Sequence, residues 1–88
     1  MRKTIVIPEQ YEKYIDLTED LFNGEKVCLK FENGYGASII HHDYSYGLEL
    51  AVVGPNGKLD YTTDITGDVV GHLDQEKLAE TLRDIQKL

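Results

Sequence analysis

The segment that decides the fold class spans residues 26–41 and reads KVCLKFENGYGASIIH. Its first half alternates apolar and polar residues, which places Val27, Leu29 and Phe31 on one face of a strand. Asn33 and Gly34 follow, and Asn-Gly is the strongest short signal for a tight β-hairpin turn. We therefore predict strands over residues 26–32 and 35–41 that pair antiparallel.

Further strands are predicted on both sides of this hairpin, where apolar residues alternate between turn signals. They cover residues 3–7, which Pro8 ends, then 48–53, and 58–63 after the turn at 54–57. The side chains expected to face the core from the last two strands are Leu48, Leu50, Val52, Leu59 and Tyr61. Consecutive strands joined by short turns predict an antiparallel meander of about four strands.

Two helices are predicted, one near each end of the chain. Residues 9–22 carry apolar and aromatic side chains at three- and four-residue spacing, and Asn23-Gly24 reads as the stop signal. Residues 75–87 form the clearer helix, with Asp74 as N-cap and an apolar stripe of Leu78, Leu82 and Ile85. Because a hairpin sheet alone is marginally stable, both helices should pack on one of its faces. The expected fold is a single two-layer α+β domain over residues 1–88.

Composition narrows the classes of function. Sixteen acidic residues against nine basic ones give a net charge of −7, which disfavours binding to nucleic-acid backbones and to anionic membranes. The charge suits a basic protein partner, and it also serves solubility. A single cysteine excludes an intrachain disulfide and is compatible with a reducing cytoplasm. The sequence has no apolar run long enough to span a membrane. The apolar run near its start is too short for a signal peptide.

Motifs for catalysis or metal binding are weak. His41, His42 and Asp43 are metal-ligating residue types, but neighbouring strand residues point to opposite faces. A site would need His42 with Asp43, or His41 with the distant His72, and we interpret the cluster as a strand end entering a polar loop. Nucleophilic catalysis by Cys28 would require a base beside the thiol, and no histidine lies near Cys28 in the sequence. We expect no enzyme activity, no metal and no cofactor.

Two surfaces are candidates for binding. Tyr35, Tyr44 and Tyr46 fall in or beside loops, and tyrosines favour recognition surfaces, although these rings also suit packing over the sheet edge. The second sheet face should carry alternate residues: Cys28, Lys30, Ser38, Ile40, His42, Glu49, Ala51 and Val53. Exposed together in a monomer, Cys28, Ile40, Ala51 and Val53 would form an apolar patch typical of an interface, either of a homodimer or with another protein. The interface candidates are Cys28, Lys30, Ile40, Ala51 and Val53.

The stretches FENGYGASII, residues 31–40, and ITGDVVGHL, residues 65–73, resemble a family of small proteins encoded by tailed bacteriophages and prophages. The resemblance extends from about residue 4 to the end, and it rests on turn and core positions. It therefore implies origin and fold, and it carries over no catalytic or ligand residue. Such an origin implies a protein that works by binding in the cytoplasm of the bacterial host.

We therefore hypothesise a binding protein that contacts a bacterial host protein, as an anti-defence or host-modulating inhibitor. Contact would use the sheet face, His42 and the tyrosine loops, and acidic Glu32, Asp43 and Glu49 would steer a basic partner. One alternative is a dimeric small-molecule sponge whose tyrosine rings stack a nucleotide base. Another alternative is a structural component of the virion or of its assembly.

Overall fold

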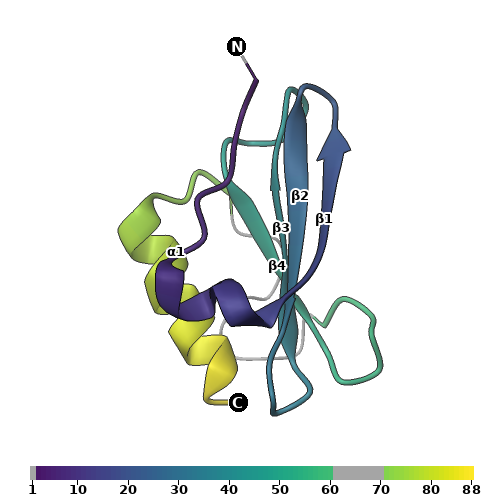
Figure 1. Cartoon of the computed structure of the whole chain (residues 1–88), viewed down its shortest axis with the longest axis vertical. Helices are drawn as coiled ribbons and strands as arrows, with labels where there is room; N and C mark the ends of the chain where they lie inside the picture. The colour runs from purple at the N-terminus through teal and green to yellow at the C-terminus, as the bar shows by residue number, and fades with distance from the viewer. Residues whose placement is uncertain (1, 61–70) are drawn as a thin grey trace.

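The computed structural model describes residues 2–60 and 71–88. Within these residues, a four-stranded antiparallel sheet of order β1-β2-β3-β4 lies against a layer of helices, which makes a two-layer α+β arrangement (Figure 1). The strands are β1 (Ile15–Leu21), β2 (Gly24–Lys30), β3 (Gly36–His41) and β4 (Glu49–Val53). The helices are the short 3-10 helix η1 (Glu9–Tyr14) and the α-helix α1 (Gln75–Gln86). No helix among the described residues has the length and apolar character needed to cross a bilayer.

The central hairpin forms as the sequence predicts. β2 and β3 pair antiparallel, with Lys30 opposite Gly36 and Val27 opposite Ile39. Gly34 has a φ of 90°, a left-handed conformation that glycine adopts without a steric penalty. β3 and β4 are also antiparallel, so the predicted meander is confirmed for these three strands.

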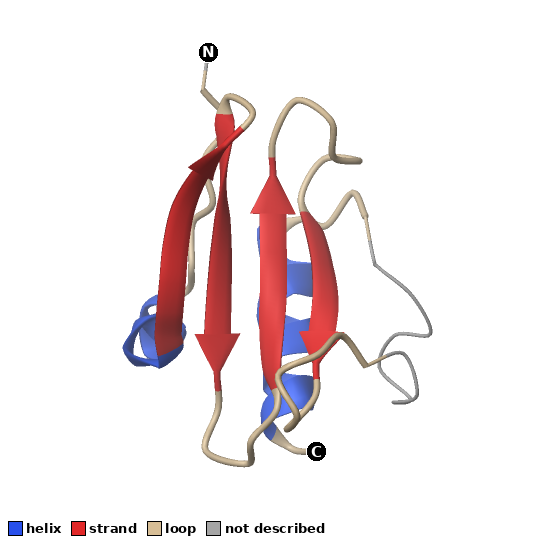
Figure 2. Ribbon diagram, turned by 90° about the vertical axis from the view of Figure 1, so that its right-hand side faces the viewer, coloured by secondary structure: helices blue, strands red, loops and turns tan. Residues whose placement is uncertain are grey.

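The core lies between the sheet and α1, which covers one face of the sheet (Figure 2). The predicted inward side chains Val27, Leu29 and Phe31 are buried there. The α1 stripe of Leu78, Leu82 and Ile85 is completely buried, as predicted. The N-cap is confirmed as well, because the Asp74 carboxylate accepts a 2.7 Å hydrogen bond from the Lys77 backbone N–H.

The predicted helix over residues 9–22 is wrong. Only Glu9–Tyr14 is helical, as a 3-10 helix, and Ile15–Leu21 forms the edge strand β1. Phe22 and Asn23 make the turn to β2 with φ values of 46° and 59°, and positive φ at both central residues is typical of a two-residue type I′ hairpin. As a strand, this segment makes its backbone hydrogen bonds to β2. As an isolated helix of the same length it would be only marginally stable, because its local helix propensity is weak.

The predicted strand over residues 3–7 does not join the sheet. Its alternation is real, since Ile5 and Ile7 pack on the core and Val6 is exposed. β1 already occupies the edge of β2, so this segment runs over the helix side of the sheet instead (Figure 1). It is held there by the Glu25 carboxylate, which accepts from the Ile5 N–H at 2.5 Å, and by Gln75, which donates to the Val6 carbonyl at 2.9 Å.

The strand predicted over residues 58–63 is not formed in the part that the structure describes. Leu59 makes an isolated bridge to Val53 and is 50% exposed, so its predicted inward orientation is wrong. The turn before it is confirmed, because the Gly57 N–H donates to the Gly54 carbonyl at 2.9 Å. Tyr61 and the rest of that prediction lie outside the described residues.

Candidate functional site

An aromatic cluster of Phe22, His42 and Tyr44 lies at one end of the sheet. Phe22 comes from the β1–β2 turn, and His42 and Tyr44 come from the loop between β3 and β4. The ring centres are 5.4 Å apart for Phe22 and His42 and 5.0 Å apart for Phe22 and Tyr44, in edge-to-face geometry. His42 is buried, whereas Phe22 is 58% and Tyr44 77% exposed. The cluster therefore exposes the rings of Phe22 and Tyr44 to solvent, and the buried His42 side chain lies beside them.

Phe22 occupies a backbone conformation that disfavours its own side chain. Its φ of 46° is left-handed, and a bulky residue there is a conformational outlier. Asn or Gly would satisfy the same turn at lower conformational cost. The turn therefore holds an exposed aromatic ring where folding alone favours a small or polar residue.

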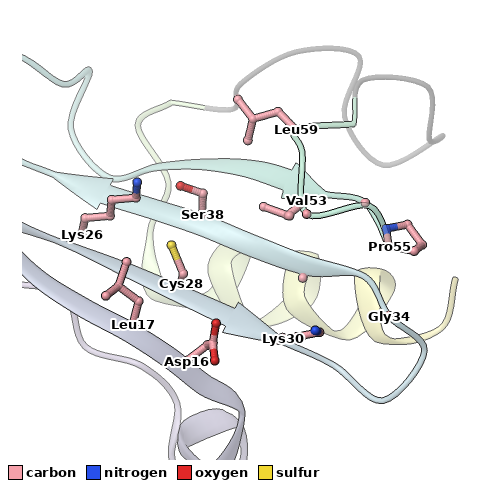
Figure 3. Close-up of a pocket in the computed structure, with 13 residues that line it drawn as sticks. Asp16, Leu17, Lys26, Cys28, Lys30, Gly34, Ser38, Val53, Pro55 and Leu59 are labelled. Atoms are coloured by element: carbon pink, nitrogen blue, oxygen red, sulfur yellow. The ribbon is translucent and has the colours of Figure 1, made fainter.

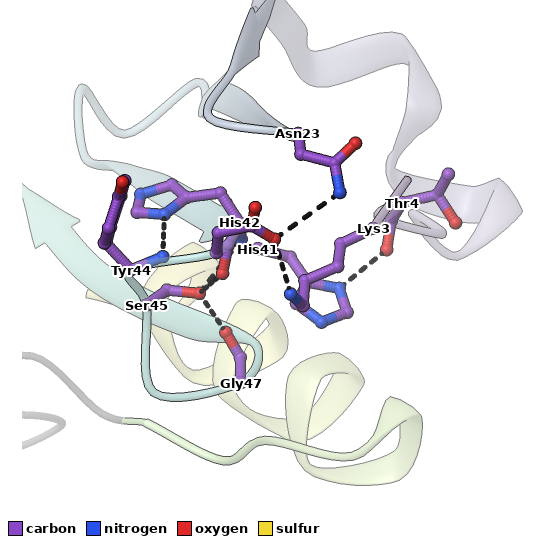
Figure 4. A network of polar contacts seen from close by, with 9 residues as sticks. Lys3, Thr4, Asn23, His41, His42, Tyr44, Ser45 and Gly47 are labelled. Atoms are coloured by element: carbon purple, nitrogen blue, oxygen red, sulfur yellow. Dashed lines mark hydrogen bonds and ion pairs between the residues drawn. The ribbon is translucent and has the colours of Figure 1, made fainter. Parts of the chain in front are cut away.

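The loop that carries Tyr44 is fixed by its own hydrogen bonds (Figure 4). Ser45 Oγ accepts from the His42 N–H at 3.0 Å and donates to the Gly47 carbonyl at 2.6 Å. The Tyr44 N–H donates to His42 Nδ1 at 3.0 Å, which assigns the ring proton of a neutral His42 to Nε2. The Asp43 N–H donates to the Phe22 carbonyl at 3.0 Å and so joins the loop to the turn. These bonds fix the backbone of the loop beside the aromatic rings.

The charges beside the cluster are paired. The Asp43 carboxylate accepts from Lys3 Nζ at 2.7 Å and from Asn23 Nδ2 at 3.5 Å (Figure 4). The hydrogen bond from Lys3, with a smaller contribution from Asn23, holds the pKa of Asp43 below its usual value. Further along the hairpin, Asp20 pairs with Arg2, and that hydrogen bond likewise lowers the pKa of Asp20. Both carboxylates are occupied by the N-terminal segment.

The predicted tyrosine group is divided by the fold. Tyr35 precedes β3 and packs against the core, whereas Tyr44 follows β3 at its other end. A six-residue strand separates them by about 20 Å, so Tyr35 cannot share a small surface with Tyr44. Tyr46 is 73% exposed, and its ring lies 6.2 Å from that of His72.

The acidic residues predicted to steer a partner are also separated. Glu32 lies in the β2–β3 turn, at the end of the sheet away from the aromatic cluster. Glu49 is only 9% exposed, and its carboxylate accepts a 2.5 Å hydrogen bond from the Tyr46 N–H. Glu49 therefore fixes the loop, and of the three predicted steering residues only Glu32 and Asp43 are exposed.

The apolar patch predicted for the second sheet face is smaller than expected. Ala51 is 5% exposed, which corrects the expectation that it lies open. Cys28, Ile40 and Val53 are half-buried, and Lys30 is exposed. The accessible part of this face thus combines modest apolar area with lysine.

The histidines do not assemble a metal site in the described part of the chain. His41 and His72 line one shallow depression with Asp74, of about 450 Å³. His41 Nδ1 is engaged with the Thr4 carbonyl at 2.9 Å. Across residues 2–60 and 71–88, no group of three or more His, Cys, Asp or Glu side chains is placed to hold an ion.

Phe22 is not among the site residues predicted from the sequence, because it falls in the segment predicted to be a helix. The local signal was a two-residue turn before the next alternating segment, which does not by itself distinguish a strand from a helix over Ile15–Leu21. That Phe22 meets Tyr44 depends on the pairing of strands across the sheet, which no local pattern reports.

Comparisons with protein-family models, with curated proteins and with solved structures found no match.

Proposed function

We propose that this chain is a small binding protein that acts by protein–protein contact through the aromatic cluster. The carrying observation is Phe22, a largely exposed aromatic ring held at a left-handed turn position. Residues in strained backbone conformations concentrate at functional sites, and aromatic rings supply much of the binding energy of interfaces.

The rigidity of the cluster supports this proposal. The loop residues Ser45 and His42 fix Tyr44, and the Asp43 N–H ties the loop to the Phe22 carbonyl. A surface ordered before binding loses little conformational entropy when a partner docks. Phe22 and Tyr44 would insert into an apolar pocket of the partner, with exposed Tyr46 on the neighbouring part of the loop.

Charge supports a basic partner, although the three acidic positions expected from the sequence do not lie together beside the cluster. Glu49 is buried and Asp43 is paired with Lys3, so the attraction would come from the overall charge of −7. Such attraction mainly raises the association rate and weakens with salt. The resemblance to phage proteins makes a bacterial host protein in the cytoplasm the proposed partner, and an inhibitory or modulating contact the proposed action.

The test compares Phe22→Asn with the wild-type chain as baits in a bacterial lysate, washed at low and at high salt. Asn is favoured in a type I′ turn, so the free energy of unfolding should stay within about 1 kcal/mol of the wild type. We expect a stoichiometric partner on the wild-type bait and at least about tenfold less on Phe22→Asn and on Tyr44→Ser, as for central aromatic contacts.

The matched control is Leu88→Asn, which removes another exposed apolar side chain far along the chain from the cluster. It should keep the partner at the wild-type level. Retention of the same partner by both Phe22→Asn and Tyr44→Ser would contradict the proposed surface.

A further inference from the structure

The face of the sheet opposite α1 carries a groove of about 470 Å³ (Figure 3). It crosses β1, β2 and β3, and the turn after β4 forms one of its walls. The side chains that matter most for its chemistry are Leu17, Lys26, Cys28, Lys30, Ser38 and Val53. The groove is separate from the aromatic cluster, and none of the three cluster residues lines it.

Small side chains in the middle of the sheet create the hollow. Cys28 lies opposite Ser38 in the register, so a row of small residues crosses β2 and β3 in the part of the face that lines the groove. Gly36 lies opposite Lys30 in the register. A Cβ added to Gly36 would lie 2.1 Å from the Leu29 carbonyl oxygen. Larger side chains border this row, so the floor of the groove lies below its walls.

The groove is locally basic in an acidic protein. Lys26 and Lys30 extend from the same face of β2 on either side of Cys28. Neither lysine forms an ion pair within the described residues. Two acidic residues lie nearby, because Asp16 also lines the groove and Glu19 lies opposite Lys26 in the register. With two lysines and one carboxylate among its lining residues, the groove favours binding of an anion, although the whole chain has a net charge of −7.

We propose that this groove binds a small organic anion with an apolar body. Lys26 and Lys30 attract the anionic group as point charges, and Leu17 and Val53 contact the apolar part. The volume of about 470 Å³ lies in the range of roughly 300–1,000 Å³ typical of small-molecule sites. This site differs from the tyrosine-stacking site expected from the sequence, and it does not rest on the proposed protein contact.

Cys28 provides a reporter inside the groove, because it is the chain's single cysteine and is half-buried on the groove floor. The experiment measures the rate at which neutral iodoacetamide alkylates Cys28, read by intact mass. The probe is the amphipathic anion 8-anilinonaphthalene-1-sulfonate, and its neutral counterpart without the sulfonate is N-phenyl-1-naphthylamine. At roughly ten times its dissociation constant, the anion should slow alkylation about tenfold, because only the unbound protein reacts.

Variants test whether Lys26 and Lys30 are responsible for the protection of Cys28 from alkylation. Lys26→Gln with Lys30→Gln should abolish the protection, whereas Lys77→Gln with Lys87→Gln changes the net charge equally on and beside α1 and should preserve it. Phe22→Asn should also leave protection unchanged, which separates this proposal from the proposed protein contact. Equal protection by the neutral probe, persistence of protection in the Lys26/Lys30 variant, or no protection of the wild type would each overturn the proposal.

Discussion

Single residues set the geometry of this sheet where strands approach most closely. Gly24 opens β2, and a Cβ added to it would lie 2.0 Å from the His41 carbonyl oxygen and 2.6 Å from the His42 Cα. Both atoms belong to the backbone, so neither can move aside without displacing a strand. Phe22, two residues earlier, is the opposite case. Its positive φ favours glycine or asparagine, yet the position carries a large side chain.

Gly24→Ala should therefore destabilise the protein by about 3 kcal/mol, as expected for severe overpacking. The matched control is Gly57→Ala, where the φ of 80° is unfavourable for alanine but, apart from its chain neighbours, no atom of the described residues lies within 4 Å of the added Cβ. That substitution should cost only about 1 kcal/mol. Urea denaturation of the two variants measures the difference, and equal costs would contradict the close approach at Gly24.

At the scale of elements, the two ends of α1 are closed in different ways. Asp74 caps the N-terminal end from the adjacent residue in the sequence. The C-terminal end is closed by Asn33, which lies in the β2–β3 turn and donates from Nδ2 to the Ile85 carbonyl at 2.9 Å. The same amide contacts the carbonyls of Gln86 and Leu88 at 3.1 Å. Asn33 thereby joins the central hairpin to the helix layer.

Asn33→Asp should destabilise the fold by about 1–3 kcal/mol, because it replaces the donor with a carboxylate beside the C-terminal carbonyls of the helix. It keeps the oxygen that accepts from the Tyr35 N–H at 2.9 Å, so the turn itself is preserved. Asn56→Asp is the control, since within residues 2–60 and 71–88 the Asn56 side chain is hydrogen-bonded only through its acceptor oxygen, toward the Lys58 N–H. It should change stability by less than about 0.5 kcal/mol. Thermal and urea unfolding distinguish the two, and an unaffected Asn33→Asp protein would refute the proposed link.

At the scale of the whole molecule, the N-terminal segment fastens the edge hairpin to the rest. Arg2 pairs with Asp20 of β1, and Lys3 pairs with Asp43 of the β3–β4 loop. The Lys3 N–H also donates to the Asn23 carbonyl at 2.9 Å. Segments far apart in the sequence are thus tied together at the end of the sheet that carries the aromatic cluster.

These pairs predict a loss of stability in acid. The pKa values of Asp20 and Asp43 are lower in the folded than in the unfolded chain, so their contribution is complete above the unfolded pKa near 3.8. It is lost as the pH falls through the lower folded pKa. Both groups are exposed, so the effect should be small and should shrink further in high salt.

The measurement is the urea midpoint from neutral pH down to below about pH 3. The double variant Asp20→Asn with Asp43→Asn should be less stable than the wild type near neutral pH and equal to it in acid. The double variant Asp16→Asn with Asp84→Asn alters two carboxylates without ion pairs among the described residues, and its difference from the wild type should vary less. A constant gap for Asp20 and Asp43 across this range would exclude the linkage.

The sequence by itself determined the central hairpin, the strand before the turn at 54–57, and the helix after Asp74 with its buried stripe. Each of these has a signal within a few residues, either a period of two, a turn dipeptide or a cap. The tertiary structure alone decided that Ile15–Leu21 is a strand and that residues 3–7 remain outside the sheet. The physical reason is that pairing with β2 outweighs a weak local preference for helix over Ile15–Leu21, and that β1 then occupies the edge of β2 that residues 3–7 would need.

The same reason governs the candidate sites. The exposure of Tyr44 and the loop around it followed from local signals, but its contact with Phe22 joins residues that are distant in the sequence. The basic groove likewise depends on the register that sets Cys28 opposite Ser38 and Leu17, together with the bulge between Ile15 and Leu17. Local sequence fixes which side chain points to which face, whereas strand pairing decides which distant side chains meet on that face.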